Sequence, residues 1–319
     1  MSAQEPVILV NSGSAVEDIV HRIHAIVPSA RIISGKDLDA DPALIEQVDY
    51  VFGRLSPEQF PQARRLKWVQ GDSAGMDWAR KPQVQTHPAV LTNARIHGVP
   101  ISEHLFGLLL MLVRGLHVSL DHQRQGQWRK PPRDALGSLW GRTLCVVGLG
   151  QIGRRCARLG RAFDMRVIGV RRRAEPVEGV EQVFTSGQLH QALRQADVVM
   201  LVLPGTQETR RLIGPAELAA MKPGALLLNA GRGRTVDTDA LVEALRSGQV
   251  SGAGLDVVDP EPLPPGHPLW TLPNVLITPH CSGHHPQYSQ RASELFLENL
   301  RRILQGQPLA FVVDKQQGY

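Results

Sequence analysis

A two-domain α/β protein is the fold class that this sequence predicts, and three observations support it. The chain has 319 residues, 42% of them hydrophobic, which is more than a single small core usually organises. Short aliphatic runs alternate with amphipathic, helix-like stretches along most of its length. The segment HGVP at residues 97–100 interrupts this alternation. We therefore place a domain boundary between residues 98 and 99.

The first series of alternating segments predicts a small α/β domain. Its strand-like runs lie within residues 7–92 and read VILV, ARII, DYVF, LKWVQ and AVLT. Between the first two runs, residues 16–27 have the periodicity of an amphipathic helix. This rhythm indicates one sheet layered with helices.

The second series predicts a doubly wound parallel sheet of six strands. The runs read TLCVV, MRVIGV, DVVMLVL, ALLLNA, VSGAGLDVV and NVLITP, and helix-like segments separate the first five. Before the last run, the Pro-rich piece from Asp259 to Pro268 is expected to be an ordered loop. Two more helices are expected, an apolar one from Ser102 to about Leu120 and an amphipathic one from about Tyr288 to Leu304. Because the chain has left the second sheet by then, we expect the last helix to return to the first domain.

A small anionic molecule is the partner that the charge pattern favours. The net charge of +5 and the pI near 9.4 would permit binding to nucleic acid. However, the 35 Lys and Arg residues are nearly matched by 30 Asp and Glu residues and are spread along the chain. The one cluster of like charge, residues 171–173, is shorter than a typical nucleic-acid-binding arm. We therefore expect no nucleic-acid partner.

The cysteines and the N-terminal segment predict a cytoplasmic protein. Three cysteines in apolar surroundings are too few for a disulfide framework or a metal cluster, so we expect no metal site. The chain runs from MSAQEP directly into a strand-like segment, without the features of an export signal. Its longest apolar run, Leu105 to Val113, is about half as long as a membrane span. We therefore expect a buried helix there and no membrane partner.

A glycine-rich turn, GLGQIG at residues 148–153, follows the run TLCVV and opens a helix. Its glycines allow a tight turn, close approach of the backbone to a pyrophosphate and close helix packing, while the helix N-terminus favours the anion. Alone, this motif is often only a tight turn, but here it lies inside a longer strand and helix series. It predicts a Rossmann dinucleotide-binding domain with these candidate contacts: Gly148, Gly150, Gln151, Ile152 and Gly153.

Two arginines at the end of the next strand predict the type of dinucleotide. An NAD-specific site usually has a carboxylate here, which hydrogen-bonds the adenosine ribose. This chain has Arg171 and Arg172 instead, whose guanidinium groups can pair with a 2′-phosphate. We expect a preference for NADP(H), with NAD(H) as the alternative cofactor. The competing interpretation is an ordinary solvated basic turn.

Three polar residues follow three strand-like runs of the second series. Arg232 follows ALLLNA, Glu261 follows VSGAGLDVV and His280 follows NVLITP. Ligands of open α/β sheets bind outside the carboxyl ends of the strands, so these side chains are candidates for one site. Individually, they also fit structural roles as a turn cation, a solvated loop acid and a strand-end cap. Together with the glycine-rich turn they predict a catalytic site.

The order of these motifs resembles that of the D-isomer-specific 2-hydroxyacid dehydrogenase family, over nearly the whole chain. That family carries the GLGQIG-type turn and the motifs LDV-x-x-x-EPLP and TPH, all present here. Other similar segments are LKWVQ with SAGMD, the EH pair at residues 103–104 and HPLW at residues 267–270. Within the family, the short length, the basic turn and the segment from Val313 to Tyr319 are most similar to glyoxylate/hydroxypyruvate reductases of the A type.

The resemblance implies hydride transfer between NAD(P)H and a small 2-keto acid, which yields a D-2-hydroxy acid. Arg232 would hold the carboxylate and keto oxygen of the substrate, His280 would donate the proton, and Glu261 would support His280. The chemistry agrees, because a protonated imidazole neutralises the charge that develops on the carbonyl oxygen and a neighbouring carboxylate stabilises the imidazolium. The planar fork of an arginine suits a carboxylate and also stabilises the developing alkoxide.

The resemblance also implies roles for residues outside this triad. The backbone amides of Ala74, Gly75 and Met76 would bind the substrate carboxylate, and Asp256 would contact the nicotinamide carboxamide. The other implied cofactor contacts are Asn229, Ala230 and Gly231. Arg54 is expected at the mouth of the pocket, although a solvated surface arginine fits it equally well.

The domain roles follow from the same resemblance, whereas the assembly is inferred from one apolar helix. A flavodoxin-like substrate domain would comprise residues 1–98 and 285–319, and the Rossmann NAD(P)-binding domain would comprise residues 99–284. The apolar helix expected at residues 101–120 is too hydrophobic for a lone surface helix. We therefore expect a homodimer in which this helix packs against its copy.

Two other functions are possible on the same scaffold. Formate dehydrogenases of this superfamily pair their histidine with a glutamine, whereas this chain has Glu261, which suits proton exchange with a hydroxy acid. Corepressors similar to the C-terminal binding proteins keep the fold and the dinucleotide site but recruit partners as dimers. The lack of a long disordered tail disfavours that second function. Turnover of a 2-keto acid would distinguish the enzyme from the corepressor.

Overall fold

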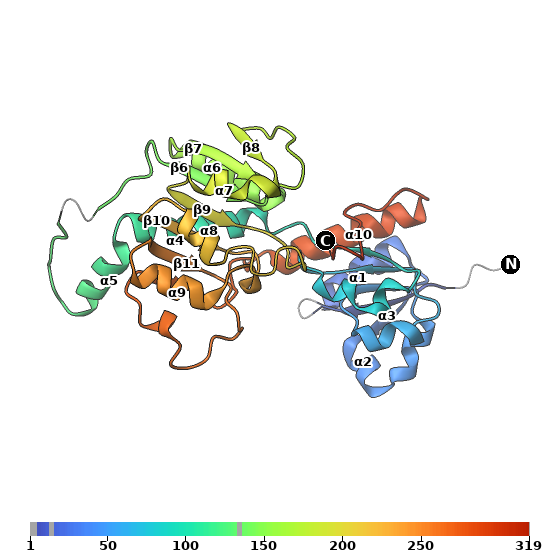
Figure 1. The fold of residues 1–319 in the computed structure, drawn as a ribbon. Coiled ribbons are helices and arrows are strands. Elements are labelled where there is room, and N and C mark those ends of the chain that lie inside the picture. The colour runs from blue at the N-terminus through green and yellow to red at the C-terminus, as the bar shows by residue number, and fades with distance from the viewer. Residues whose placement is uncertain (1–4, 13–15, 133–135, 319) are drawn as a thin grey trace. The chain divides into compact units, whose positions relative to one another are not determined.

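The computed structural model describes residues 5–12, 16–132 and 136–318. The chain divides into two compact units, one of Met1–His97 with His285–Tyr319 and one of Gly98–His284 (Figure 1). The expectation that there is no export signal rests partly on residues 1–4, which lie outside the described part of the chain. Tyr319, the last residue of the C-terminal segment that resembles the family, also lies outside it.

The first unit is built on a five-stranded parallel sheet with the order β2-β1-β3-β4-β5. Its strands are β1 (Val7–Asn11), β2 (Arg31–Ser34), β3 (Tyr50–Gly53), β4 (Trp68–Gln70) and β5 (Val90–Thr92). The central strand β1 pairs on both sides, with Leu9 opposite Ile33 in β2 and opposite Val51 in β3. This is the flavodoxin-like strand order, which confirms the predicted fold class.

The C-terminal helix contributes to the core of the first unit. The helices of this unit are α1 (Val16–Ile26), α2 (Gly35–Ala40), α3 (Pro82–Gln85) and α10 (Tyr288–Leu304), with 3₁₀ turns η1 (Pro42–Gln47), η2 (Pro57–Gln62) and η3 (Asp77–Arg80). The ring of Phe296 in α10 stacks on Trp68 in β4, with ring centroids 5.0 Å apart. Buried Asn299 of α10 donates to Gln70 at 2.9 Å. With α1, α10 thus covers one face of the sheet, and Phe296 shares a core with Ile8 and Ile23.

The second unit contains a seven-stranded parallel sheet with the order β12-β11-β10-β9-β6-β7-β8. The strands are β6 (Thr143–Val147), β7 (Arg166–Val170), β8 (Gln182–Phe184), β9 (Val198–Leu201), β10 (Ala225–Asn229), β11 (Val250–Leu255) and β12 (Val275–Ile277). From β6 the chain winds first toward β7 and β8 and then, on the other side, toward β9 to β12. This double winding confirms the predicted Rossmann-type sheet and places its switch point between β6 and β9.

The prediction of six strands in this sheet was wrong, because the described part of the chain forms seven. The additional strand, β8, is only three residues long and pairs with β7, with Ile168 opposite Gln182. A three-residue strand is too short to show a period of two in the sequence. The fully described connection from β11 to β12 holds the 3₁₀ turn η7 (Pro268–Trp270) and no α-helix, which agrees with the loop expected at Asp259 to Pro268.

The single helix expected from Ser102 to about Leu120 is two helices. The first, α4 (Gly98–Val113), begins earlier than expected, and the second, α5 (Leu116–Arg124), follows after a bend of 73°. Gly115 lies at the bend with a left-handed φ of 59°, a conformation that ends a helix. By length and hydropathy, no single helix in the described part of the chain is suited to cross a membrane. Only α4 and α5 taken together pass that test.

Helices cover both faces of the second sheet. On one face α4 and α6 (Gln151–Ala162) pack with Leu105, Leu109, Val146 and Leu228 in one core cluster. The helices α7 (Leu189–Leu193), α8 (Pro215–Ala220) and α9 (Thr238–Arg246) cover the other face. The apolar character of α4 is therefore accounted for by burial inside its own unit.

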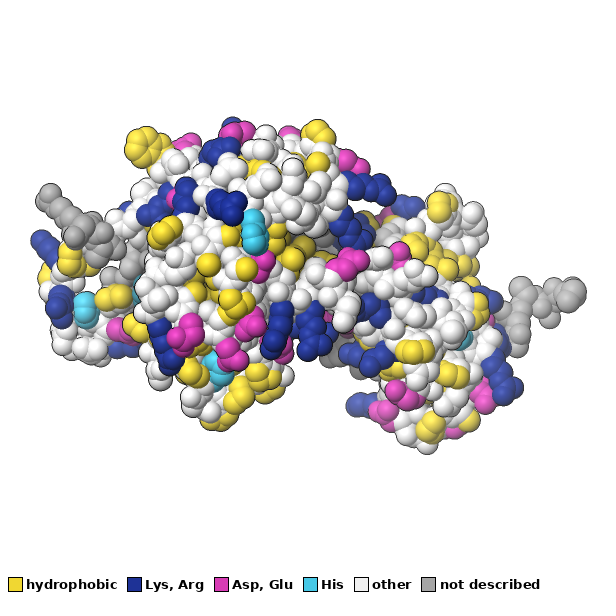
Figure 2. Space-filling view, in the orientation of Figure 1, with side chains coloured by type: hydrophobic (Ala, Val, Ile, Leu, Met, Phe, Trp, Pro, Cys, Tyr) yellow, Lys and Arg dark blue, Asp and Glu magenta, His cyan; other side chains and the backbone are white. Residues whose placement is uncertain are grey.

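Two of the three free cysteines are part of these cores. Cys145 in β6 and Cys156 in α6 are fully buried, and burial raises the pKa of both thiols to about 12. Buried thiols of this kind are unreactive. On the surface, Figure 2 shows basic and acidic side chains interspersed over the face in view. Positive charge is therefore not gathered into one stripe on that face.

Candidate active site

The carboxyl ends of three neighbouring strands of the second sheet carry the predicted catalytic residues. In the sheet, β11 lies between β10 and β12, with Leu255 opposite both Asn229 and Ile277. Arg232, Glu261 and His280 lie in the segments that leave these three strands. The parallel order of the strands therefore brings all three segments to one edge of the sheet.

His280 and Glu261 form a direct pair. The Nδ1 atom of His280 lies 2.6 Å from Oε1 of Glu261, and both side chains are partly exposed, at 47% and 41%. A carboxylate only accepts hydrogen bonds, so Nδ1 carries the hydrogen in this pair. In the described part of the chain Nε2 has no hydrogen-bond partner, which leaves it as the ring nitrogen that can exchange a proton.

The backbone at His280 adopts a left-handed conformation with φ 52°. A side chain other than glycine rarely adopts this conformation, and it persists where neighbouring contacts determine it. The amide of His280 donates to the carbonyl oxygens of Asp256 at 2.9 Å and Thr278 at 3.0 Å. The turn that presents the imidazole is therefore tied to the end of β11.

The carboxylate of Asp256 also holds this turn, through hydrogen bonds to residues on both sides of His280. It accepts hydrogen bonds from Thr278 Oγ1 at 2.7 Å, from the amides of Cys281 at 3.0 Å and Ser282 at 3.1 Å, and from Ser282 Oγ. Burial opposes ionisation of Asp256, but these hydrogen bonds outweigh burial and hold the pKa of the carboxyl below its usual 3.8. Asp256 therefore stays ionised throughout the neutral pH range.

A glycine-flanked turn after β10 carries Arg232. Asn229 closes this turn, because its Oδ1 accepts from the Gly231 amide at 3.0 Å and its Nδ2 donates to the Arg232 carbonyl at 3.1 Å. A Cβ on Gly233 would overlap the carbonyl of Val258, so the turn lies directly against the segment that leads to Glu261. The Arg232 backbone is thereby fixed close to that segment, with its Nη1 donating to the Gly231 carbonyl at 2.8 Å.

The glycine-rich turn has the geometry of an anion-binding site. Gly148 has a φ of 106°, and a Cβ on Gly153 would overlap the carbonyl of Gly148, so neither position accepts a side chain. By contrast, a Cβ on Gly150 would meet no atom within 4 Å. No side chain caps α6, which begins at Gln151 and includes Ile152. Open space in front of an uncapped helix N-terminus fits the pyrophosphate of a dinucleotide.

Arg171 and Arg172 follow β7, next to this turn in the sheet. Arg171 pairs with Glu175 at 3.1 Å, and Arg172 pairs with Glu208 at 3.2 Å. Both pairs are partly exposed, and exposed ion pairs are weak. The guanidinium groups are therefore held by partners that a phosphate could replace.

Comparison with known proteins identifies the family. The model of the family "D-isomer specific 2-hydroxyacid dehydrogenase, NAD binding domain" matches residues 106–282. A glyoxylate reductase of Thermofilum pendens is 34% identical over 310 residues, which cover 93% of this chain and 88% of that protein. This chain belongs to the D-isomer specific 2-hydroxyacid dehydrogenase family. The predicted family and the predicted class of NAD(P)-dependent oxidoreductase are confirmed.

Solved structures of the family agree with this assignment. A D-isomer specific 2-hydroxyacid dehydrogenase family protein of Aeromonas salmonicida is 34% identical, with a TM-score of 0.84, over 98% of this chain and 100% of that chain. An NADPH-dependent glyoxylate/hydroxypyruvate reductase of Sinorhizobium meliloti, in complex with NADP and sulfate, is 28% identical with a TM-score of 0.82. That match covers 99% of this chain and 100% of the relative.

In the first unit of this 2-hydroxyacid dehydrogenase, the predicted substrate-binding residues form a loop after β4. The amide groups of Ala74, Gly75 and Met76 donate to no acceptor in the part of the chain that the structure describes. Successive unpaired amides of this kind suit an anion. Arg54 is exposed, with its guanidinium 5.9 Å from the ring of Trp78.

Sequence reasoning gave no role to three residues that support the turn of His280. Thr278, Ser282 and His104 all belong to the hydrogen-bonded group around Asp256. Thr278 and His104 lie in motifs that resemble the family, but nothing in their spacing links them to each other. Asn229, Ala230 and Gly231 were expected as cofactor contacts, and here Asn229 holds the Arg232 turn.

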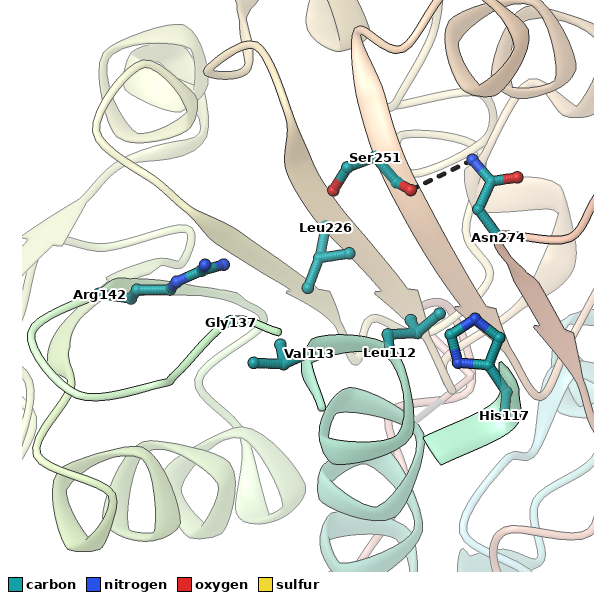
Figure 3. A pocket seen from close by; sticks show the side chains of 8 residues that line it. All are labelled: Leu112, Val113, His117, Gly137, Arg142, Leu226, Ser251 and Asn274. Carbon is teal, nitrogen blue, oxygen red and sulfur yellow. Dashed lines mark hydrogen bonds between the residues drawn. The ribbon is translucent and has the colours of Figure 1, made fainter. Parts of the chain in front are cut away.

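A cavity of about 280 Å³ in the second unit lies apart from these residues (Figure 3). Its lining includes Leu226, Ser251 and Asn274, which lie at or just before the amino ends of β10, β11 and β12. Arg142 and His117 also line it. Because Arg232, Glu261 and His280 follow the carboxyl ends of the same strands, the cavity is not part of the candidate active site.

Proposed function

We propose that this enzyme reduces small 2-keto acids, such as glyoxylate and hydroxypyruvate, to D-2-hydroxy acids with His280 as the proton donor. The observation that carries this proposal is the His280–Glu261 pair, which leaves Nε2 available in a segment that leaves the same edge of the sheet as the Arg232 turn. The names of the Thermofilum and Sinorhizobium relatives support the choice of substrates.

In this mechanism the chain binds and orients the keto acid and supplies one proton. A reduced nicotinamide dinucleotide held at the glycine-rich turn would supply the hydride that the carbonyl carbon accepts. The guanidinium of Arg232 pairs with the substrate carboxylate and stabilises the developing alkoxide. His280 Nε2 donates its proton to that oxygen, and Glu261 stabilises the imidazolium before the transfer. In the oxidation direction, neutral His280 accepts the proton.

In the first unit, the loop of residues 74–76 is proposed to bind the substrate carboxylate through its three free amides. Accordingly, we assign the substrate-binding role to the unit that contains β1 to β5 and the NAD(P)-binding role to the unit that contains the glycine-rich turn. Arg54 is proposed to contact polar groups of larger substrates. The cytoplasm is the compartment that we propose, because all three cysteines are free.

Steady-state kinetics with a panel of 2-keto acids, each with NADPH and NADH, tests the proposed function. Reduction of glyoxylate or hydroxypyruvate with a kcat/KM of about 10⁴ M⁻¹s⁻¹ or more is expected for an enzyme. A partner-recruiting protein on the same fold would bind the dinucleotide without turnover. Absence of turnover with every keto acid, while NADPH still binds, would favour that second function.

NADPH is expected to be the preferred cofactor, and Arg172→Ala is expected to reduce that preference. The 2′-phosphate would replace Glu208 as the partner of Arg172, and a charge-assisted hydrogen bond contributes about 1.5 to 3 kcal/mol. The ratio of kcat/KM for NADPH over NADH should therefore fall roughly 10- to 150-fold. Arg173→Ala, at the exposed neighbouring position, is the matched control. Equal losses with both cofactors would contradict the assignment.

A homodimer is also proposed, on different surfaces from those that the sequence suggested. The expected interface helix is mostly buried as α4, but α5 has no buried residue. The segment that follows α5 exposes Trp128 at 96% and Trp140 at 77%, and Figure 1 shows α5 at the periphery of the second unit. Exposed aromatic groups of this size are typical of interfaces between proteins, and a second copy is the partner that we propose.

Sedimentation velocity is expected to show a dimer for the wild-type protein and a monomer for Trp128→Asp. A carboxylate at this position would lie in the proposed interface, where an unpaired charge is strongly unfavourable. Leu304→Asp serves as the control, because Leu304 is 51% exposed at the end of α10 in the other unit. A wild-type monomer at micromolar concentration would rule out the dimer.

A further inference from the structure

We propose that His104 and Thr278 are positioning residues for His280 and that they act through the carboxylate of Asp256. This inference rests on the proposed role of His280 as proton donor. It assigns functions to two side chains that do not reach the reacting atoms.

The direction of each hydrogen bond follows from the donors that are present. Thr278 Oγ1 donates to Oδ1 of Asp256 at 2.7 Å, because an ionised carboxylate only accepts. A hydroxyl has one hydrogen, so Thr278 Oγ1 must accept its second hydrogen bond, from Nε2 of His104 at 2.8 Å. The chain of donors therefore runs from His104 in α4, through Thr278 after β12, to Asp256 after β11. It joins a helix to two strand ends.

The Asp256 carboxylate accepts several hydrogen bonds from its own unit. Its side chain is 0% exposed, and a carboxylate offers about four lone-pair positions. Thr278 Oγ1, the two amides of Cys281 and Ser282, and Ser282 Oγ donate to it. The carboxylate therefore joins the residues on both sides of His280.

This group of hydrogen bonds surrounds the residue whose backbone needs support. Cys281 and Ser282 follow His280 directly, Thr278 precedes it by two positions, and His280 itself has the left-handed φ of 52°. Loss of one donor would let the turn relax toward a more common conformation. The imidazole would then move relative to the substrate, and a displacement of about 1 Å from productive geometry costs on the order of 10²-fold in rate.

Thr278→Val tests the inference, because valine keeps the shape of threonine but lacks the hydroxyl. We expect kcat for keto-acid reduction to fall about 10- to 100-fold, while the Kd for NADPH, measured by fluorescence titration, stays within about twofold. Thr278→Ser restores the hydroxyl and should recover most of the rate. Thr271→Val is the matched control, because the Thr271 hydroxyl donates to the Pro268 carbonyl at 3.1 Å, in an exposed turn of the same unit. It should behave as wild type.

His104→Phe and His104→Gln provide a second, independent pair. Phenylalanine keeps the ring but removes the donor to Thr278, and glutamine can place an amide donor near the same position. We expect the kcat loss with phenylalanine and partial recovery with glutamine, again without a change in NADPH affinity. This pair keeps the test valid if Thr278→Val does not fold.

The outcomes separate this inference from the proposed function. If wild type and Thr271→Val reduce keto acids but Thr278→Val and His104→Phe do so equally well, the positioning role is wrong. If the Kd for NADPH rises in proportion to the loss of kcat, the group acts on the cofactor, and the positioning role is wrong. If wild type itself has no turnover, the proposed function fails first.

Discussion

Replacement of His280 by alanine is expected to lower the rate of keto-acid reduction by about 10²- to 10⁴-fold, the usual contribution of a general acid. The expectation rests on the Nε2 atom of His280, which is available while Nδ1 is held by Glu261 at 2.6 Å. The measurement is kcat in a reaction that a deuteride isotope effect shows to be limited by hydride transfer. His190→Ala is the matched control, because His190 makes a similar pair with Glu217 at 2.8 Å elsewhere in the same unit.

The pH profiles of the two directions should be opposite. Reduction requires the imidazolium and should slow as pH rises, whereas oxidation requires the neutral ring and should slow as pH falls. Glu261→Gln removes the carboxylate that lies 2.6 Å from Nδ1 of His280, so the rate of keto-acid reduction should fall. A His280→Ala enzyme with the wild-type rate and pH profile would require a different proton donor.

Arg232→Lys is expected to fold and to lose about 10²- to 10³-fold in kcat/KM, as is typical when a donor to a developing oxyanion is removed. A lysine keeps the positive charge but cannot reproduce the planar, two-pronged contact with a carboxylate. The turn itself should survive, because both hydrogen bonds of the Asn229 side chain remain when lysine removes the guanidinium donor to the Gly231 carbonyl.

Arg234→Lys offers a control two residues away, since Arg234 is exposed on the same 3₁₀ turn, η6 (Gly233–Thr235). It should retain wild-type kinetics. Circular dichroism and thermal unfolding of both variants would establish that they are folded. Wild-type efficiency in Arg232→Lys would remove Arg232 from the site.

The sequence predicted the parts of the fold that depend on local pattern. The Gly148 turn, the strand runs and α10 each have periodicity or spacing that can be recognised in a single segment. The three-residue strand β8 has no such pattern, and its position is set by pairing with β7. The break between α4 and α5 depends on the backbone of Gly115, whereas the surrounding apolar residues continue the helical pattern. Local pattern therefore predicted the elements better than their interruptions.

The candidate site shows the same limit. Arg232, Glu261 and His280 could be proposed from the sequence because each follows a recognisable strand run. The residues that support His280 could not be proposed from the sequence. His104 and Thr278 are separated by 174 positions and meet only when α4 packs against the sheet. Asp256 was correctly singled out, but its partners are set by that packing. Residues that position others are visible only in three dimensions.

Because the core of the first unit needs α10, the two units should not fold in the order in which their strands are synthesised. The strands β1, β3 and β4 leave the ribosome early, yet one face of their sheet is completed by Phe296 and its neighbours near the end of the chain. The second unit has no such dependence, because its core clusters lie within Gly98–His284. It can therefore fold while the N-terminal strands still expose an apolar face. During translation, that face is where a nascent-chain chaperone would be expected to bind.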